Sequence, residues 1–215
     1  MVSRIFWQNP YQTELNTRVA SVDGDNVSVA ETIFFAFSGG QESDQGTIGG
    51  HRVIAAQKRG SEIIYTLEAG HGLEVGSPVA ICIDWPRRYK LMRLHFAAEL
   101  VLELVYQKLD SVTKAGAQIA EDKARIDFEW PENISGLLTE LEADVQDIIE
   151  TDKPIICGFS DEANGRRYWK IDGFSEVPCG GTHVRTTGEI GTVSLKRKNP
   201  GKGKERIEIF IRDDG

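Results

Sequence analysis

The stretch KLMRLHFAAELVLELVYQKL, residues 90–109, divides the chain into two kinds of sequence. Its apolar residues recur three or four positions apart, which predicts an amphipathic helix. These residues are Leu91, Leu94, Ala98, Leu102, Val105 and Leu109. Before this stretch the chain consists of short runs suited to strands, and after it strand-like runs and a further helix alternate. We therefore place a domain boundary near residue 86, which gives domains at residues 1–85 and 86–215.

The first domain is predicted to be a small β-barrel. Residues 17–22 and 27–29 flank the sequence Asp23-Gly24-Asp25-Asn26, which is typical of a hairpin turn. Further short β runs follow at even spacing, separated by glycine-bearing turns, as expected for a barrel. They cover residues 32–37, 51–57, 62–67 and 78–83.

The second domain is predicted to be α+β. A strand at residues 124–128 precedes Pro131, after which a helix runs to about Thr151, with Asn133 or Ser135 as its N-cap. Four more strands are expected, at residues 155–159, 167–171, 191–196 and 205–211. The fold class is therefore α+β, with an N-terminal small β-barrel followed by an α+β domain.

The charge of the chain is unevenly distributed. A formal net charge of -8 argues against a protein that coats nucleic acid without specificity. Residues 185–206 nevertheless hold seven basic residues and only two acids. Local charge decides what a surface can contact, so this segment is a candidate for binding phosphate. The basic residues are Arg185, Lys196, Arg197, Lys198, Lys202, Lys204 and Arg206.

The cysteine content indicates a reducing compartment. Three cysteines in a chain of this length do not form a disulfide framework, and the first residues lack the apolar core of a signal peptide. No apolar run approaches the roughly 20 residues that a membrane-spanning helix requires. We expect a cytoplasmic protein without a membrane partner. Cys82 and Cys157 lie in apolar strand contexts, which predicts inert buried thiols.

Cys179-Gly180-Gly181-Thr182-His183 places a thiolate and an imidazole four positions apart. Cysteine sulfur and histidine nitrogen are preferred ligands of Zn²⁺. His95 and Glu99 could supply the second half of a site, because helical spacing puts both side chains on one face. Hydrolysis at a zinc ion is the resulting hypothesis.

Three motifs in this order resemble the AlaX-type trans-editing proteins and the matching editing region of alanyl-tRNA synthetase. The first is FFAFSGGQESDQGTI at residues 34–48, which is similar to the glycine-rich segment of the family's barrel. The second is RIDF at residues 125–128. The third is VPCGGTHV at residues 177–184 followed by TGEIG at 187–191, which is similar to the family's zinc-bearing signature. The resemblance covers nearly the whole chain.

The resemblance implies a free-standing editing enzyme with a zinc-containing editing domain. Its activity would be hydrolysis of the ester that links a wrong amino acid, chiefly serine and sometimes glycine, to alanine tRNA. Mischarged alanine tRNA is then the expected partner and Zn²⁺ the expected cofactor. A zinc hydrolase acting on another aminoacyl ester, as in threonyl-tRNA synthetase editing domains, is less consistent with the glycine-rich segment.

The chain departs from the family at Glu99. The family's helix motif is His-x-x-x-His, whereas this chain has His95-x-x-x-Glu99. Glu99 could be the fourth zinc ligand, or His95, Cys179 and His183 could hold the metal while Glu99 acts as a general base. A third interpretation is a noncatalytic tRNA-binding module with a degenerate metal site.

Further residues are assigned to substrate contacts. Thr182, Gln118 and Thr187 are candidates for hydrogen bonds to the serine hydroxyl, which alanine lacks. Gly39, Gly40 and Gln41 are predicted to form a glycine turn that helps to orient the acceptor stem. The basic residues expected to contact tRNA are Arg185, Lys196, Arg197, Lys198, Lys202 and Lys204.

Overall fold

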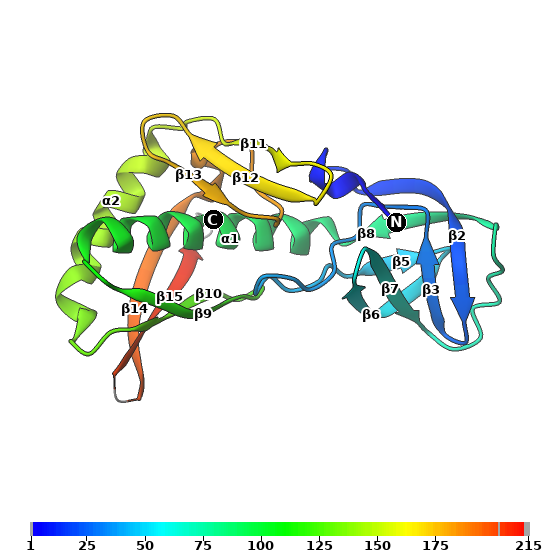
Figure 1. Cartoon of the computed structure of the whole chain (residues 1–215), viewed down its shortest axis with the longest axis horizontal. Helices are drawn as coiled ribbons and strands as arrows, with labels where there is room; N and C mark the ends of the chain where they lie inside the picture. Colours follow the sequence, from blue (N-terminus) through cyan, green and yellow to red (C-terminus); the bar gives the residue numbers. More distant parts are fainter. Residues whose placement is uncertain (1, 202, 213–215) are drawn as a thin grey trace. The chain divides into compact units, whose positions relative to one another are not determined.

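The computed structural model describes residues 2–201 and 203–212, so Lys202, one of the predicted tRNA contacts, lies outside the described residues. The chain divides into two compact units between Lys90 and Leu91 (Figure 1). Strands and helices are both present, which confirms the predicted α+β class.

Six strands of the first unit pair in the closed order β2-β3-β7-β6-β5-β8. They are β2 (Glu14–Asp23), β3 (Asn26–Val29), β5 (Gly46–Ile48), β6 (His51–Arg59), β7 (Glu62–Leu67) and β8 (Pro78–Ile83). Val27, Tyr65 and Ile81 are fully buried in the core of this unit. A Cβ atom on Gly46 would lie 2.1 Å from the Cys82 carbonyl oxygen, so glycine is required where β5 meets β8. Short elements precede the ring or lie between its strands: β1 (Ser3–Arg4), η1 (Ile5–Trp7) and β4 (Glu31–Thr32).

The strand predicted at residues 32–37 is wrong beyond Thr32. β4 ends there, and the backbone that follows is held mainly by side chains. The Phe34 N–H donates to the Thr32 hydroxyl at 3.0 Å, and the Phe35 N–H donates to the Asp44 carboxylate at 2.6 Å. Side chains thus satisfy backbone groups that a neighbouring strand would otherwise satisfy.

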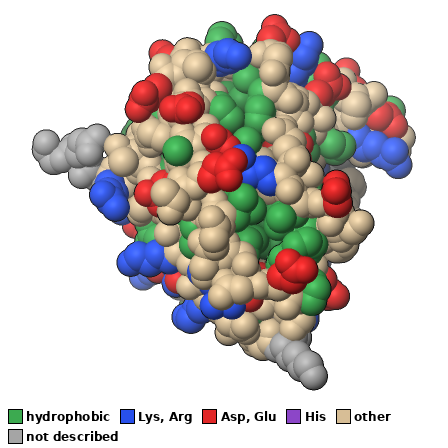
Figure 2. Space-filling model, turned by 90° about the vertical axis from the view of Figure 1, so that its left-hand side faces the viewer, with side chains coloured by type: hydrophobic (Ala, Val, Ile, Leu, Met, Phe, Trp, Pro, Cys, Tyr) green, Lys and Arg blue, Asp and Glu red, His purple; other side chains and the backbone are tan. Residues whose placement is uncertain are grey.

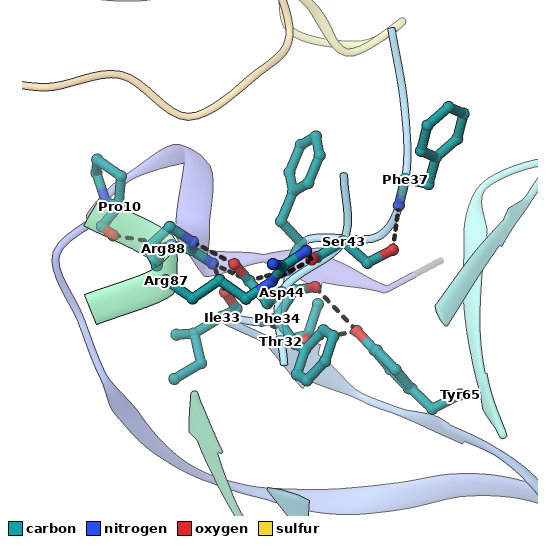
Figure 3. A network of polar contacts seen from close by, with 11 residues as sticks. Pro10, Thr32, Ile33, Phe34, Phe37, Ser43, Asp44, Tyr65, Arg87 and Arg88 are labelled. Carbon is teal, nitrogen blue, oxygen red and sulfur yellow. Dashed lines mark hydrogen bonds and ion pairs between the residues drawn. The ribbon is translucent and has the colours of Figure 1, made fainter. Parts of the chain in front are cut away.

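A buried ion pair between Arg88 and Asp44 organises this segment (Figure 3). Both side chains are fully buried, and Arg88 Nε donates to Asp44 Oδ1 at 2.7 Å. The same guanidinium donates to the carbonyl oxygens of Pro10 at 2.8 Å and Ile33 at 2.6 Å. One arginine therefore ties three separate chain segments to the first turns of the long helix.

That helix, α1 (Trp85–Lys108), begins earlier than the predicted start at residue 90. Asp84 precedes it, and the Asp84 carboxylate accepts a hydrogen bond from the Arg87 N–H at 3.1 Å. Pro86 fits the first turn because the backbone donors there have no partner within the helix. The apolar repeat begins only at Leu91, so the sequence pattern predicted a start at residue 90 and missed the first turn of the helix.

The second unit contains two antiparallel sheets, in the orders β14-β15-β10-β9 and β11-β12-β13. Asn133 caps its short helix η2, as predicted, by accepting from the Ser135 N–H at 2.8 Å. Two described strands of this unit were not predicted, β9 (Thr113–Ile119) and β13 (Ser175–Pro178). The other elements are β10 (Ala124–Glu129), η2 (Ile134–Leu137), α2 (Leu138–Glu150), β11 (Ile156–Asp161), β12 (Arg166–Ile171), η3 (Thr187–Ile190), β14 (Thr192–Gly201) and β15 (Lys204–Arg212).

Within the described residues, no helix combines the length and the apolar composition needed to cross a membrane.

Replacing Asp44 by alanine should lower the free energy of unfolding by about 3–5 kcal/mol, because the Arg88 charge is then left buried without its partner. Urea unfolding followed by circular dichroism measures this. Glu42→Ala is the matched control. Its carboxylate pairs with Arg87 at 2.8 Å but is 31% exposed, so its loss should cost about 1 kcal/mol or less. Similar losses for the two variants would contradict a special role for Asp44.

Candidate metal centre

Two pairs of residues from distant parts of the sequence meet in the second unit. His95 and Glu99 lie one turn apart on α1, so their side chains project from the same face of the helix. Cys179 directly follows β13, and His183 lies four residues further on. The Cys179 N–H donates to the Arg167 carbonyl oxygen at 2.9 Å, which continues the pairing of β12 with β13 and fixes where the turn begins.

The donor atoms of these residues lie close together. Cys179 Sγ is 3.6 Å from His95 Nε2 and 3.3 Å from His183 Nε2. Glu99 Oε1 is 3.2 Å from His95 Nε2 and 3.6 Å from Cys179 Sγ. Ligand atoms of His95, Cys179 and His183 all lie within 4.8 Å of one another. The structure thus brings together all four residues for which the sequence predicts metal binding.

These separations fit a zinc ion. Zinc bonds of about 2.0–2.1 Å to nitrogen or oxygen and about 2.3 Å to sulfur, in a tetrahedron, place neighbouring ligand atoms about 3.3–3.6 Å apart. The four separations given above run from 3.2 to 3.6 Å, which is close to this range. His95 and His183 are 5% and 4% exposed, so their imidazoles are screened from water.

The two histidines have raised pKa values. Burial by itself lowers the pKa of His95, but the Cys179 charge and hydrogen bonds to Cys179 and Glu99 outweigh it and raise that pKa to about 10. Burial also lowers the pKa of His183. The Cys179 charge and hydrogen bonds to Cys157 and Cys179 outweigh it there and raise the pKa to about 9. These raised pKa values favour the protonated form of both imidazoles when no metal is bound.

The two acids have lowered pKa values. Burial raises the pKa of the Cys179 thiol, but the charges of His95 and His183 outweigh it and lower that pKa to about 6. Burial likewise raises the pKa of Glu99, and its hydrogen bond and charge interaction with His95 lower it to about 2. The cluster thus holds two cations and two anions. A divalent metal ion that replaces the two imidazolium protons leaves this balance unchanged, so the donor set suits Zn²⁺.

Side chains around the cluster contact its members. Trp169 Nε1 donates to Glu99 Oε2 at 3.0 Å, and Cys157 Sγ lies 3.2 Å from His183 Nδ1. The prediction that Cys157 is an inert buried thiol is wrong, because this residue is exposed on β11, the edge strand of its sheet. Cys82, predicted to be buried as well, is partly exposed. The apolar neighbours of both cysteines misled the sequence analysis, and no local signal marked Trp169.

Comparisons with known proteins bear on this cluster. Residues 167–208, which include Cys179 and His183, match the family described as threonyl and alanyl tRNA synthetase second additional domain. The chain is 29% identical to the alanyl-tRNA editing protein AlaX-M of Pyrococcus horikoshii, over 98% of both proteins. It is 32% identical to AlaX-M of Saccharolobus solfataricus, over 99% of this chain and 100% of that protein. The chain belongs to the AlaX-M family of alanyl-tRNA editing proteins.

The family resemblance predicted from the motifs is thereby confirmed. A larger protein is also similar: the chain is 28% identical to the alanine–tRNA ligase of Methanococcus vannielii, over 95% of this chain but only 25% of the ligase. This AlaX-M family member thus aligns with the full length of the Saccharolobus solfataricus protein and with a quarter of the ligase.

The three residues predicted to recognise the serine hydroxyl lie in different places. Thr187 is fully buried, and its hydroxyl donates to the Ile148 carbonyl oxygen at 3.0 Å. Thr182 is 1% exposed and lies in the turn between Cys179 and His183. Gln118 lies on β9, where its side-chain oxygen accepts from Arg125 Nε at 3.0 Å. It lines a surface hollow of about 180 Å³, and none of the described residues lining that hollow belongs to the cluster. The structure places Thr182 next to the cluster and gives no such place to Gln118.

The basic residues predicted to bind tRNA are not equally available. Arg185, Lys196, Lys198 and Lys204 are exposed. Arg197, in contrast, donates to both carboxylate oxygens of Glu205, at 2.5 and 2.6 Å, and Glu205 is 3% exposed. The guanidinium of Arg197 is thus engaged within the protein, and its predicted contact with tRNA stays a prediction. On the face shown in Figure 2, Lys and Arg side chains are interspersed with Asp and Glu.

The glycine turn of the first unit also requires a correction. Gly39 and Gly40 have φ angles of 62° and 91°, and the backbone groups of Ser38 and Gln41 pair across them. The predicted turn is therefore present. Gln41, however, is only 1% exposed, so its side chain cannot be the part that contacts tRNA.

Glu205→Gln should destabilise the protein at pH 7 and have less effect in acid. The hydrogen bond from Arg197 lowers the pKa of Glu205, so the folded state binds this proton less tightly than the unfolded chain does. The stabilisation is therefore complete above the unfolded pKa of about 4.3 and is lost as pH falls through the lower folded-state pKa. Urea unfolding of both proteins from pH 7 downward measures the difference, and a pH-independent difference would contradict this linkage.

Proposed function

We propose that this protein is a zinc-dependent trans-editing hydrolase that removes serine, and glycine to a lesser degree, from mischarged alanine tRNA. Membership of the alanyl-tRNA editing family supports a hydrolase acting on aminoacyl-tRNA. The observation that carries the zinc dependence is the buried donor cluster of His95, Cys179 and His183, with Glu99 against two of them. The editing domain spans residues 86–215, and the glycine-rich barrel domain spans residues 1–85.

His95, Cys179 and His183 would hold the metal. A bound zinc ion would supply Lewis-acid polarisation of the ester carbonyl, which would have to enter as an additional ligand if four protein residues hold the metal. The thiolate of Cys179 and the carboxylate of Glu99 offset the metal charge in a site that is largely closed to solvent. The rings of Phe96 and His183 pack edge to face with their centroids 5.4 Å apart, which restricts the orientation of the imidazole.

Glu99 is the fourth ligand in this proposal. Its Oε1 atom lies as far from Cys179 Sγ as His95 Nε2 does, 3.6 Å in each case, as expected for two vertices of one tetrahedron. A general base would instead have to face a water molecule and leave metal binding to the other three residues. The two roles differ in what the loss of the carboxylate does to zinc affinity.

Discrimination against alanine requires a group that recognises the serine hydroxyl. Thr182 is proposed for this role because it is buried in the turn that carries Cys179 and His183. A site that hydrogen-bonds the serine hydroxyl loses that contact when alanine occupies it, and the loss disfavours cleavage of the correct product. Gln118 is the weaker candidate because Arg125 already occupies its side-chain oxygen.

Recognition of tRNA is assigned to the exposed basic residues. Arg185, Lys196, Lys198 and Lys204 are exposed, so their positive charges can reach phosphate. In the first unit, Gly39 is exposed. We assign the backbone of Gly39 and Gly40 to contact with the tRNA acceptor stem. Contacts of this kind position a substrate and carry little sequence information.

Cys179→Ala and His183→Ala should each abolish seryl-tRNA hydrolysis and remove bound zinc while leaving the fold intact. Single-turnover deacylation of seryl-, glycyl- and alanyl-tRNA, with zinc quantified in the same preparation, tests this. Cys82→Ser, in the first unit, is the matched cysteine control and should stay active. Full activity of both ligand variants would refute the zinc centre. Tight tRNA binding by the wild type without any cleavage would support the noncatalytic alternative.

Glu99→Gln should weaken zinc binding markedly, because a neutral amide replaces an anionic ligand in a buried site. Glu99→His should keep zinc bound at saturating metal, since imidazole is also a zinc ligand. Competition with a chelator gives the affinity, and deacylation at saturating zinc gives the turnover. If Glu99→Gln keeps wild-type zinc affinity and loses only turnover, Glu99 is the base and not a ligand.

A further inference from the structure

The two carboxylate oxygens of Glu99 have different neighbours. Oε1 faces His95 Nε2 and Cys179 Sγ, whereas Oε2 accepts a hydrogen bond from the Trp169 indole N–H at 3.0 Å. We infer that Trp169 is a positioning residue that holds Oε2 away from the metal centre and so makes Glu99 a one-oxygen ligand. This inference rests on the proposed function, because it assigns a role within the same zinc site.

Trp169 is itself firmly held. It lies on β12, the middle strand of its sheet, where it pairs with Cys157 on one side and Val177 on the other. Its side chain is fully buried, and its ring packs edge-on against Phe96 with centroids 5.1 Å apart. Phe174 stacks on it at 6.4 Å. An indole packed in this way has little freedom to turn, so its N–H direction is fixed by the sheet.

The hydrogen-bonding character of indole makes this contact selective. Indole N–H is a donor and never an acceptor, so it matches a carboxylate oxygen. A neutral imidazole that gives one nitrogen to a metal carries hydrogen on the other, and that N–H cannot accept from Trp169. The tryptophan therefore favours a carboxylate at position 99 and opposes a histidine whose outer nitrogen would face it.

Losing this donor would affect the metal ligand directly. The Glu99 side chain is 13% exposed, so Oε2 has little access to water that could replace the indole. Without the indole, the carboxylate can rotate and present either oxygen, or lose contact with the centre. Outer partners of metal ligands typically contribute about 10- to 100-fold to metal affinity.

A double-mutant cycle tests the inference by zinc affinity, measured by chelator competition. Trp169→Phe keeps an aromatic ring but removes the donor, and should weaken zinc binding by about 10- to 100-fold in the wild-type background. In the Glu99→His background the same change should not weaken binding, because there is no carboxylate to position. Trp130→Phe is the matched control: it is in the same unit, and none of its described contacts is with the cluster.

The outcomes separate this inference from the proposed function. An equal loss in both backgrounds would show that Trp169 acts only through packing, and no loss in either would show no role; both results overturn the inference and leave the zinc enzyme standing. A wild-type protein that binds no zinc would overturn the inference and the proposed function together.

A second measurement avoids any change at Trp169. The four tryptophans of the chain give four indole N–H resonances. In metal-loaded wild-type protein one of them should be shifted by its carboxylate acceptor, and Glu99→Ala should move that resonance alone by a large amount. If Glu99→Ala leaves all four resonances in place, the hydrogen bond does not exist in solution and the inference is wrong.

Discussion

Charged side chains that leave water must be matched by opposite charge, and the donor cluster does this with side chains from two distant segments. Helix α1 supplies His95 and Glu99, and the turn after β13 supplies Cys179 and His183. Each pair carries one positive and one negative charge, and the contact between Cys179 Sγ and His95 Nε2, at 3.6 Å, joins the two pairs. An imidazolium or a thiolate without such partners would be costly to bury. The pairing of β12 with β13 is therefore part of the site, because it fixes where the turn that carries Cys179 and His183 begins.

The first unit meets the same constraint with different residues. Between β4 and β5 the chain does not continue as a strand, so its backbone needs partners from elsewhere. Asp44 and Arg88 provide them, and each satisfies the other's charge while reaching backbone groups of Phe35, Ile33 and Pro10. The glycine-rich motif thus stabilises the first unit through Asp44, and the Gly39–Gly40 turn is the part of the motif that reaches the surface.

Belonging to the AlaX-M family accounts for the general arrangement of the chain, while the environment of Glu99 is a matter of this particular structure. A carboxylate in a zinc site brings negative charge and a second oxygen that needs its own partner. The chain provides that partner from Trp169, which is fixed by strand pairing and by aromatic packing. Glu99 therefore contacts Trp169 through one oxygen and His95 and Cys179 through the other. Changing Glu99 also changes what Trp169 contacts.

Local patterns in the sequence determined the α+β class, the helix around His95, the Asn133 cap and most strands of the second unit. They also determined the four donor residues, because i,i+4 spacing on a helix and a Cys-x-x-x-His turn are local features. The start of α1 at Trp85, the strands β9 and β13, the exposure of Cys157, the burial of Gln41 and the pairing of Arg197 with Glu205 were decided only by the tertiary structure. So was the contact between Trp169 and Glu99, which are 70 residues apart in the chain. The physical reason is common to these cases: burial and pairing depend on which segments pack together, and the chemistry of a single segment does not specify its neighbours.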